Sequence, residues 1–319
     1  MIIVTGGCGL IGTHILMELN RLGFERDIIV VDDFKKSTKW KNLRQKKYGE
    51  FVSRFELFDW LDEQEEEVRA IIHMGANSAT TGIDGDEYYD LNYRYTLDLA
   101  NYALGVGARF IYASSAATYG DGSNGFSDDI DQLDVLKPLN LYGQSKQMVD
   151  QWMVSNGYLD DVVGLKFFNV YGPYEGHKGR MASMCYHMFH QIQNEGKVKL
   201  FQSNSENFKD GAQLRDFIYV KDVAKITCGF LFNEVGGIYN VGTGEPRSFN
   251  DMAKAVFQSM DLTPNIEYIP MPSDLQKSYQ NFTCADMRKL SSVMRVSLTS
   301  LEEGVEDYVQ NYLLRGEGC

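Results

Sequence analysis

The segment Thr5-Gly6-Gly7-Cys8-Gly9-Leu10-Ile11-Gly12 lies between an apolar run, residues 1–4, and a helical pattern of leucines at residues 16–22. The apolar run is typical of a short buried strand. Glycines at Gly6, Gly9 and Gly12 permit a tight turn and let a pyrophosphate approach the backbone, and the helix that follows offers free N–H groups at its N-terminus. A strand, a glycine turn and a helix in this order predict a dinucleotide-binding unit.

A second predicted strand, residues 28–31, ends in two carboxylates, Asp32 and Asp33. A carboxylate about 20 residues after the glycines bonds a ribose 2′-hydroxyl, which favours NAD. Lys35, Lys36 and Lys39 follow at once and could hold a 2′-phosphate, which favours NADP, or could belong to a solvated loop. The sequence leaves both cofactors open.

The pattern of strand followed by helix repeats along the first half of the chain. Strands are expected at residues 71–73 and 109–113, with a long helix carrying Asn92 over residues 88–104. This alternation predicts an α/β fold, a Rossmann-type doubly wound parallel sheet. Ligands in such sheets bind at the carboxyl ends of the strands. Ser115 falls at one such end, and a turn that could pass under the cofactor falls at another: Met74, Gly75, Ala76, Asn77 and Ser78.

Tyr142-Gly143-Gln144-Ser145-Lys146 opens an apolar-periodic run that predicts a helix. Tyr142 and Lys146, four residues apart, would lie on the same helical face. A phenol has a pKa of about 10, and a nearby cation favours the phenolate and lowers that pKa. The pair is therefore a candidate proton-transfer device, and a hydroxyl at Ser115 could bond both the phenol and a substrate.

The composition excludes several classes of protein. With 319 residues, 44% hydrophobic and 24% charged, the chain has the composition of a globular protein. A net charge of −13 leaves no broad basic surface for nucleic acid or anionic lipid. We expect no membrane span, no signal peptide and a cytoplasmic location. Five scattered cysteines without CxxC spacing predict reduced thiols, and we expect no metal site.

Together these segments resemble the extended short-chain dehydrogenase/reductase superfamily. Residues 167–173 (FFNVYGP) resemble its sugar-nucleotide branch. Residues 175–183 (EGHKGRMAS), 205–209 (SENFK), 215–217 (RDF) and 279–283 (YQNFT) are similar to the ADP-L-glycero-D-manno-heptose 6-epimerases. The resemblance covers nearly the whole chain. It implies inversion of C6 of the heptose in ADP-D-glycero-D-manno-heptose by transient oxidation to a ketone, with NADP as cofactor. That reaction supplies a nucleotide sugar for the inner core of lipopolysaccharide.

The resemblance also implies roles for individual residues. Lys178 would be the second acid/base beside Tyr142, although a plain diphosphate contact is the alternative. Arg215 would bind the diphosphate of the substrate, since a guanidinium can form two parallel hydrogen bonds with a phosphate. The cofactor would contact Leu10, Ile11, Asp32, Asp33, Lys39, Asn92, Lys146, Val170 and Lys178. The substrate would contact Ser115, Asn169, Arg180, His187, Phe201, Gln202, Ser203, Asn204, Arg215 and Tyr279.

Three positions depart from the family pattern: Asp33 stands where Asn is usual, Tyr174 where Arg is usual, and residues 210–214 are an insertion. We expect a dinucleotide-binding domain over residues 1–170 that also recruits part of 217–260, and a smaller, discontinuous substrate domain mainly within 171–319. By resemblance the chain would form a homo-oligomer, a pentamer.

Other functions are open on the same scaffold. One is a different nucleotide-sugar epimerase or a dehydratase. A dehydratase needs an Asp-Glu pair where Ala116-Ala117 stands, which counts against it. Another is a dinucleotide binder without catalysis, which should have lost Tyr142 or Lys146.

Overall fold

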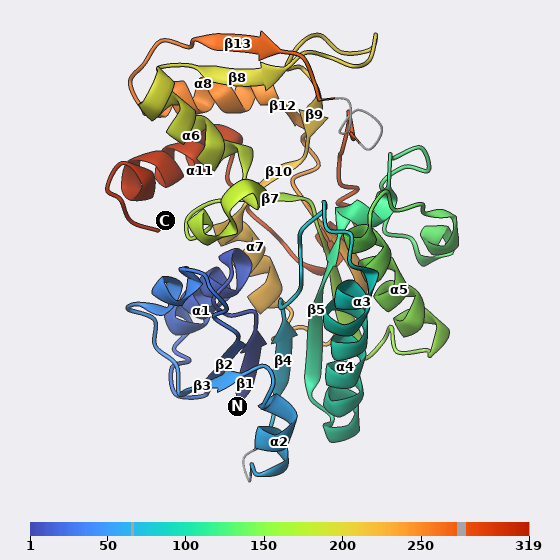
Figure 1. Cartoon of the computed structure of the whole chain (residues 1–319). Helices are drawn as coiled ribbons and strands as arrows, with labels where there is room; N and C mark the ends of the chain where they lie inside the picture. The colour runs from blue at the N-terminus through green and yellow to red at the C-terminus, as the bar shows by residue number, and fades with distance from the viewer. Residues whose placement is uncertain (65–66, 273–278, 319) are drawn as a thin grey trace.

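A seven-stranded parallel sheet forms the centre of the computed structural model, which describes residues 1–64, 67–272 and 279–318. The strand order is β11-β6-β5-β4-β1-β2-β3, so the predicted doubly wound sheet is confirmed (Figure 1). Its strands are β1 (Ile2–Thr5), β2 (Ile28–Asp32), β3 (Glu50–Ser53), β4 (Ala70–His73), β5 (Arg109–Ser115), β6 (Val162–Phe167) and β11 (Gly237–Val241).

Helices cover both faces of this sheet because its strands carry apolar residues on both sides. In β1, Ile2 and Val4 pack with α1 (Leu10–Arg21) and α7 (Val220–Gly229) on one face. Ile3, between them, faces the opposite core with α4 (Tyr95–Val106) and α5 (Leu141–Ser155). This alternation is the period of two that strand geometry imposes. Three short helices complete this part: α2 (Leu57–Asp62), α3 (Gly85–Tyr88) and α10 (Arg288–Val293).

A smaller layer lies beyond the carboxyl ends of the strands (Figure 1). The parallel strands β8 (Val198–Phe201) and β13 (Ile266–Ile269) pack with α6 (Met184–Glu195), α8 (Phe249–Ser259) and α11 (Leu301–Tyr308) around a separate core. Ser248 caps α8, since its hydroxyl and the Asp251 carboxylate form a capping box there. Two strand pairs connect the layers: β7 (Asn169–Tyr171) with β10 (Phe217–Tyr219), and β9 (Leu214–Arg215) with β12 (Arg247–Ser248).

The long helix expected over residues 88–104 is not a single α-helix. A π-helical segment, η2 (Tyr89–Arg94), joins α3 to α4, and its wider turn carries Asn92, which is fully buried. The terminal helix likewise changes to a π-helix, η6 (Val309–Leu313). The short 3-10 helices are η1 (Lys39–Leu43), η3 (Ala116–Tyr119), η4 (Ile130–Val135) and η5 (Gly176–Met181).

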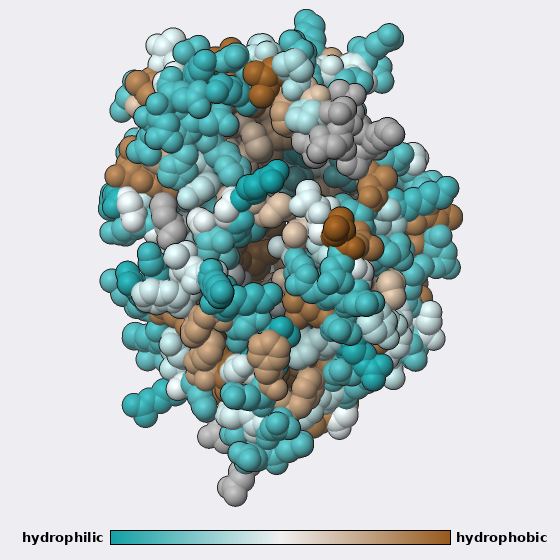
Figure 2. All heavy atoms as spheres, in the orientation of Figure 1, coloured by the Kyte–Doolittle hydropathy of each residue, from teal (hydrophilic) through white to brown (hydrophobic). Residues whose placement is uncertain are grey.

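Among the described residues, no helix is long and apolar enough to cross a membrane. Cys8, Cys185, Cys228 and Cys284 are free thiols, and Cys319 lies outside the described part of the chain. The face drawn in Figure 2 is hollowed between the large sheet and the smaller layer. The division of the chain into two domains stays a prediction.

Candidate active site

The glycine turn between β1 and α1 leaves no room for side chains at Gly6 and Gly12. Gly6 has φ of +65°, and a Cβ there would lie 2.6 Å from the Gly75 nitrogen. A Cβ on Gly12 would lie 2.2 Å from the Gly6 carbonyl oxygen. Gly9 is the N-cap of α1 and no side chain caps it, so the first backbone N–H groups of the helix are open to an anion. The turn therefore fits the pyrophosphate of a dinucleotide.

The predicted segment Met74–Ser78 follows β4 and lies against this turn. The Met74 and Gly75 N–H groups donate to Thr5, to its carbonyl at 3.1 Å and its hydroxyl at 3.3 Å. Asn92 accepts from the Asn77 N–H at 2.8 Å, and its amide donates to the Asn77 carbonyl at 2.9 Å and to the Ser145 hydroxyl at 3.0 Å. The buried π-helical Asn92 thus ties this segment to α5, the helix of Tyr142 and Lys146.

Two carboxylates and two cations meet at the end of β2. Asp32 accepts from the Cys8 N–H at 2.8 Å and from the Lys39 ammonium at 2.6 Å. Asp33 accepts from Lys39 at 3.1 Å and from the Arg54 Nε at 2.5 Å. Arg54 is not among the residues predicted from the sequence. It directly follows β3, whose register pairs Ser53 with Asp32, and that strand pairing is not visible in the sequence.

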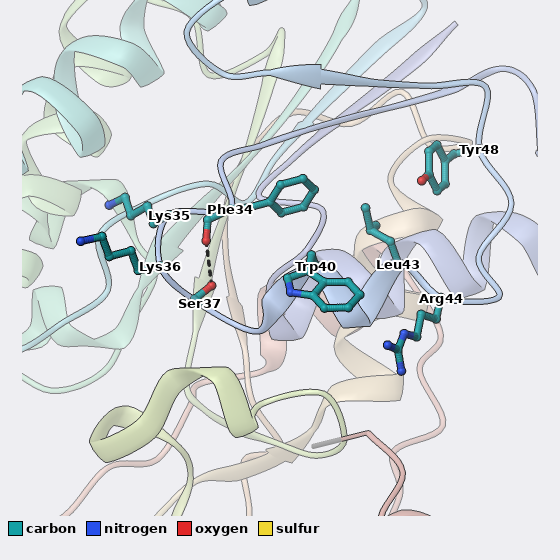
Figure 3. A pocket seen from close by; sticks show the side chains of 8 residues that line it. All are labelled: Phe34, Lys35, Lys36, Ser37, Trp40, Leu43, Arg44 and Tyr48. Atoms are coloured by element: carbon teal, nitrogen blue, oxygen red, sulfur yellow. Dashed lines mark hydrogen bonds between the residues drawn. The ribbon is translucent and has the colours of Figure 1, made fainter.

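The loop after Asp33 lines an open pocket of about 600 Å³ (Figure 3). Its lining residues are Phe34, Lys35, Lys36, Ser37, Trp40, Leu43, Arg44 and Tyr48. Lys35 and Lys36 are exposed and point to the side of the loop away from Tyr48 (Figure 3). Of the three lysines predicted at this loop, Lys39 is the one that forms ion pairs with the two carboxylates.

Ser115, Tyr142 and Lys146 come together at the carboxyl end of β5. Ser115 ends that strand and its side chain hydrogen-bonds the Tyr142 phenol. Lys146, one helical turn after Tyr142, is 1% exposed. Burial lowers the pKa of Lys146 to about 8, with Asp150 opposing the shift. The ammonium group therefore lies in a poorly solvated environment, where its charge acts strongly on neighbours.

The expected lowering of the phenol pKa is wrong for this structure. Burial raises the pKa of Tyr142 above its usual value, and the hydrogen bond with Ser115 only partly opposes the shift. Removing a phenolate from water is unfavourable, and here this desolvation exceeds any help from Lys146. Tyr142 is therefore a phenol, a proton donor, at neutral pH.

A buried ion pair lies behind these three residues. The Asp150 carboxylate on α5 accepts from the Tyr112 hydroxyl at 3.0 Å, and from the Ser114 hydroxyl and the Lys166 ammonium at 2.7 Å each. Lys166 also donates to the Thr118 hydroxyl at 2.7 Å, which in turn donates to the Ser115 carbonyl at 2.8 Å. This chain of bonds connects α5 to β5, β6 and the Ser115 backbone, and the sequence analysis did not include it.

Lys178 lies half-buried on η5 near the glycine turn. Burial lowers the pKa of Lys178, with the nearby Glu175 carboxylate opposing. Glu175 is fully buried, and both its oxygens accept from Ser183 at 2.6 Å. Asn42 of η1 donates to the carbonyls of Cys8 at 2.9 Å and Tyr174 at 3.1 Å. The amide of Asn42 therefore joins the glycine turn to the segment that carries Lys178.

Arg215 and two aromatic rings mark the substrate side. The Arg215 guanidinium is 6% exposed and lies 5.1 Å from the ring of Tyr279, which is 6.4 Å from the ring of Phe201. Asn169 in β7 accepts from the Thr283 hydroxyl at 3.3 Å. These four predicted residues come from β7, β8, β9 and the segment after the undescribed residues 273–278, so the fold gathers side chains distant in sequence.

The insertion, residues 210–214, packs between the loop after β8 and the start of α8. Asp210 accepts from the Ser203 N–H at 2.8 Å, and the Asn250 N–H donates to the Gly211 carbonyl at 3.0 Å. Gln213 is 1% exposed, and its Nε2 has no hydrogen-bond partner among the described residues. Gln213 precedes Arg215 by two residues. Because side chains two apart in an extended chain point to the same side, Gln213 lies on the side of Arg215. It is a further polar candidate that the sequence analysis missed.

The other predicted residues lie on several elements of the fold. Leu10 and Ile11 open α1, and Val170 packs between two of the cores. Arg180 is exposed, and the His187 Nε2 lies 3.4 Å from its carbonyl. Gln202, Ser203 and Asn204 form the loop after β8. Tyr174, a departure from the family pattern, has φ of +71° and packs its ring against His14 and Tyr312.

No group of three or more His, Cys, Asp or Glu residues in the described ranges could hold a metal ion. His187 and His190 both lie on α6. The residues that could exchange protons thus lie in two places: Ser115, Tyr142 and Lys146 at the end of β5 and the start of α5, and Lys178 on η5. This arrangement is suited to moving protons next to a bound redox cofactor.

Comparison with known proteins gives matches along the whole chain. A model of the NAD dependent epimerase/dehydratase family matches residues 2–242. The ADP-L-glycero-D-manno-heptose-6-epimerase of Nitratidesulfovibrio vulgaris strain Hildenborough is 49% identical over 317 residues, 98% of each chain. The protein of the same name from Fusobacterium nucleatum subsp. nucleatum is 47% identical over 328 residues, 99% of this chain and 98% of that one. The crystal structure of the Helicobacter pylori ADP-L-glycero-D-manno-heptose-6-epimerase matches with a TM-score of 0.81 and 28% identity, covering 97% of this chain and 95% of that one.

Proposed function

This chain belongs to the NAD dependent epimerase/dehydratase family, and from this membership we propose that it inverts C6 of the heptose in ADP-D-glycero-D-manno-heptose, giving ADP-L-glycero-D-manno-heptose. The observation that carries the proposal is the 49% identity to an epimerase of that name along 98% of both chains. The retained Ser115, Tyr142, Lys146 and Lys178 supply the acid/base groups that the reaction needs.

The reaction oxidises C6 and then reduces it from the other face. When bound, a nicotinamide cofactor would supply the hydride acceptor and donor. The first half-reaction breaks the C6–H and O–H bonds and forms a ketone, and a protein base takes the hydroxyl proton. The second half-reaction forms a new C6–H bond on the opposite face, and a protein acid returns a proton to the oxygen. Two acid/base groups, one for each epimer, satisfy this requirement.

We assign these two roles to Tyr142 and Lys178. The Ser115 hydroxyl bonds Tyr142 and would hold the sugar oxygen beside it, and the Lys146 charge would favour the phenolate during proton abstraction. Lys178 has a pKa lowered by burial, which brings an ammonium group closer to the range where it exchanges protons at neutral pH. One residue takes the proton while the other returns one, so an exchange between them through solvent restores the starting state.

The region around Arg215 would bind the nucleoside diphosphate part of the substrate. Arg215 would grip the diphosphate, with Tyr279 and Phe201 beside the nucleoside, while Arg180 and His187 lie at the more exposed edge. A dehydratase is not favoured, because the required acid/base pair is replaced by Ala116 and Ala117 at the start of η3. We further propose that the chain forms a homo-oligomer and is located in the cytoplasm. Light scattering coupled to size-exclusion chromatography measures the mass of the oligomer.

The cofactor is a nicotinamide dinucleotide. The resemblance implies NADP, with Lys39 beside its 2′-phosphate, whereas Asp32 and Asp33 favour NAD. Mass spectrometry of the cofactor released on denaturation separates the two.

The test of the reaction is incubation of the enzyme with ADP-D-glycero-D-manno-heptose, followed by NMR of the heptose at C6. We expect signals of the L-glycero epimer to appear until the two epimers reach equilibrium. An unchanged spectrum, with conversion of a different nucleotide sugar, would replace the proposal with the alternative epimerase activity.

A further inference from the structure

Asp33 lies at the carboxyl end of β2, where Lys39 and Arg54 meet it and where the ribose of a bound dinucleotide would lie. It follows β2 directly, and the parallel register of β2 with β3 places Arg54 beside it. Its Oδ2 accepts from the Arg54 Nε at 2.5 Å and its Oδ1 accepts from the Lys39 ammonium at 3.1 Å. Asp33 therefore forms ion pairs with two cations that could otherwise bind a phosphate at this place.

These four side chains are balanced in charge. Burial alone would raise the pKa of Asp33, but the bonds from Arg54 and Lys39, with a smaller contribution from the charge of Lys35, outweigh it and the pKa lies below its usual value. Burial would likewise lower the pKa of Lys39, but Asp32 and Asp33 outweigh it and the pKa lies above its usual value. At neutral pH two carboxylates thus face two cations, and no positive charge is left over.

Asp32 retains the capacity to accept a hydroxyl. Its Oδ2 takes a hydrogen bond from the Cys8 N–H at 2.8 Å, whereas Oδ1 takes those of Lys39 and the Asp33 N–H. A carboxylate oxygen can accept two hydrogen bonds, so Oδ2 can receive a ribose 2′-hydroxyl. This is the contact by which such a carboxylate recognises NAD.

We infer that Asp33 is a specificity residue that selects NAD over NADP in this chain, an inference that rests on the proposed function for its use of a nicotinamide cofactor. A 2′-phosphate would have to break the ion pairs of Asp33 with Arg54 and Lys39 and then lie beside an uncompensated carboxylate. NAD leaves those pairs intact. The resemblance implies NADP, and one side chain reverses that choice.

Lys35 and Lys36 do not supply the missing charge. Both are exposed on the loop lining the pocket in Figure 3, where water and salt screen their attraction for a phosphate.

The experiment measures binding, not turnover. Protein freed of cofactor is titrated with NAD⁺ and with NADP⁺ by isothermal calorimetry. For the wild type we expect NAD⁺ to bind about tenfold or more tightly than NADP⁺, because one like-charge contact within a few ångströms is worth at least that factor. Asp33→Asn keeps the shape, removes the charge and frees both cations. In this variant the affinity for NADP⁺ should rise by about tenfold or more while that for NAD⁺ changes little.

Asp27→Asn is the matched control. Asp27 is exposed just before the opposite end of the same strand, so this change alters the net charge equally without touching the ribose site, and both affinities should stay as in the wild type. A wild type that binds NADP⁺ more tightly, or a selectivity that Asp33→Asn leaves unchanged, overturns the inference. If Asp33→Asn fails to fold, the cofactor released from the denatured wild type is identified by mass spectrometry. NAD would support the inference, and NADP would overturn it. Tighter binding of NADP⁺ by a wild type that converts ADP-heptose would refute the selectivity alone. Preferential NAD binding without conversion would refute the proposed function alone.

Discussion

Asp150→Asn changes one atom of a buried carboxylate and leaves its partner, Lys166, charged. Asp150 is 0% exposed and Lys166 is 1% exposed. Breaking a buried ion pair by removing one partner costs about 3–5 kcal/mol, because the remaining charge is uncompensated. Globular proteins have total free energies of unfolding of about 5–15 kcal/mol, so this loss is a large part of the whole.

The assay is urea denaturation followed by circular dichroism, with the cofactor concentration held constant. We expect Asp150→Asn to lower the free energy of unfolding by about 3 kcal/mol or more without changing the denaturant slope. The double variant Asp150→Asn with Lys166→Met should recover most of this loss, because it buries no unpaired charge. Glu267→Gln is the control, since its ion pair with Lys197 is solvent-exposed, with side chains 44% and 36% exposed. Its midpoint should match the wild type.

The same variants connect the ion pair to catalysis. Lys166 donates to Thr118, and Thr118 donates to the Ser115 carbonyl, so loss of the pair should displace Ser115 and lower kcat more than it raises KM. A double variant as unstable as the single one would refute the argument from an uncompensated charge. Wild-type stability of Asp150→Asn would refute the claim that the pair is buried and ionised.

Four further predictions concern the site itself. Tyr142→Phe should lower kcat by about a hundredfold or more while cofactor binding is retained, since it removes an acid/base group; near-normal turnover measured by NMR would remove that role. Lys178→Met should behave likewise, and wild-type turnover would make Lys178 a plain diphosphate contact. Gly12→Ala should abolish calorimetric cofactor binding, because its Cβ would meet the Gly6 carbonyl oxygen at 2.2 Å; unchanged affinity would mean that the turn adjusts. Burial lowers the pKa of Lys146 from 10.5 to about 8. Between these two pH values the unfolded chain binds more protons at Lys146 than the folded chain does. The loss of stability caused by burying Lys146 therefore shrinks as the pH rises. The stability that Lys146→Met gains over the wild type should therefore be larger at about pH 7 than at about pH 10 in urea denaturation, and a gain independent of pH would contradict the shift.

Local geometry accounts for the parts of this protein that the sequence predicted. A strand, a glycine turn and a helix are adjacent in the chain, and the spacing of Tyr142 and Lys146 is one helical turn. Each follows from backbone geometry within a few residues. The alternation of apolar runs with helical patterns likewise predicted the doubly wound sheet, whose seven strands are all parallel.

Contacts between distant residues account for what the sequence did not predict. Arg54 is beside Asp33 only because β3 pairs with β2, and Asp150 meets Lys166 only because α5 packs on β5 and β6. The direction of a pKa shift also depends on the tertiary structure, since it depends on burial. The nearby Lys146 led us to expect a lowered pKa for Tyr142, but burial raises it. The sequence alone determined the fold class and the residue types of the site. The packing decided their charge states and their partners, because desolvation and ion pairing act over distances that chain order does not encode.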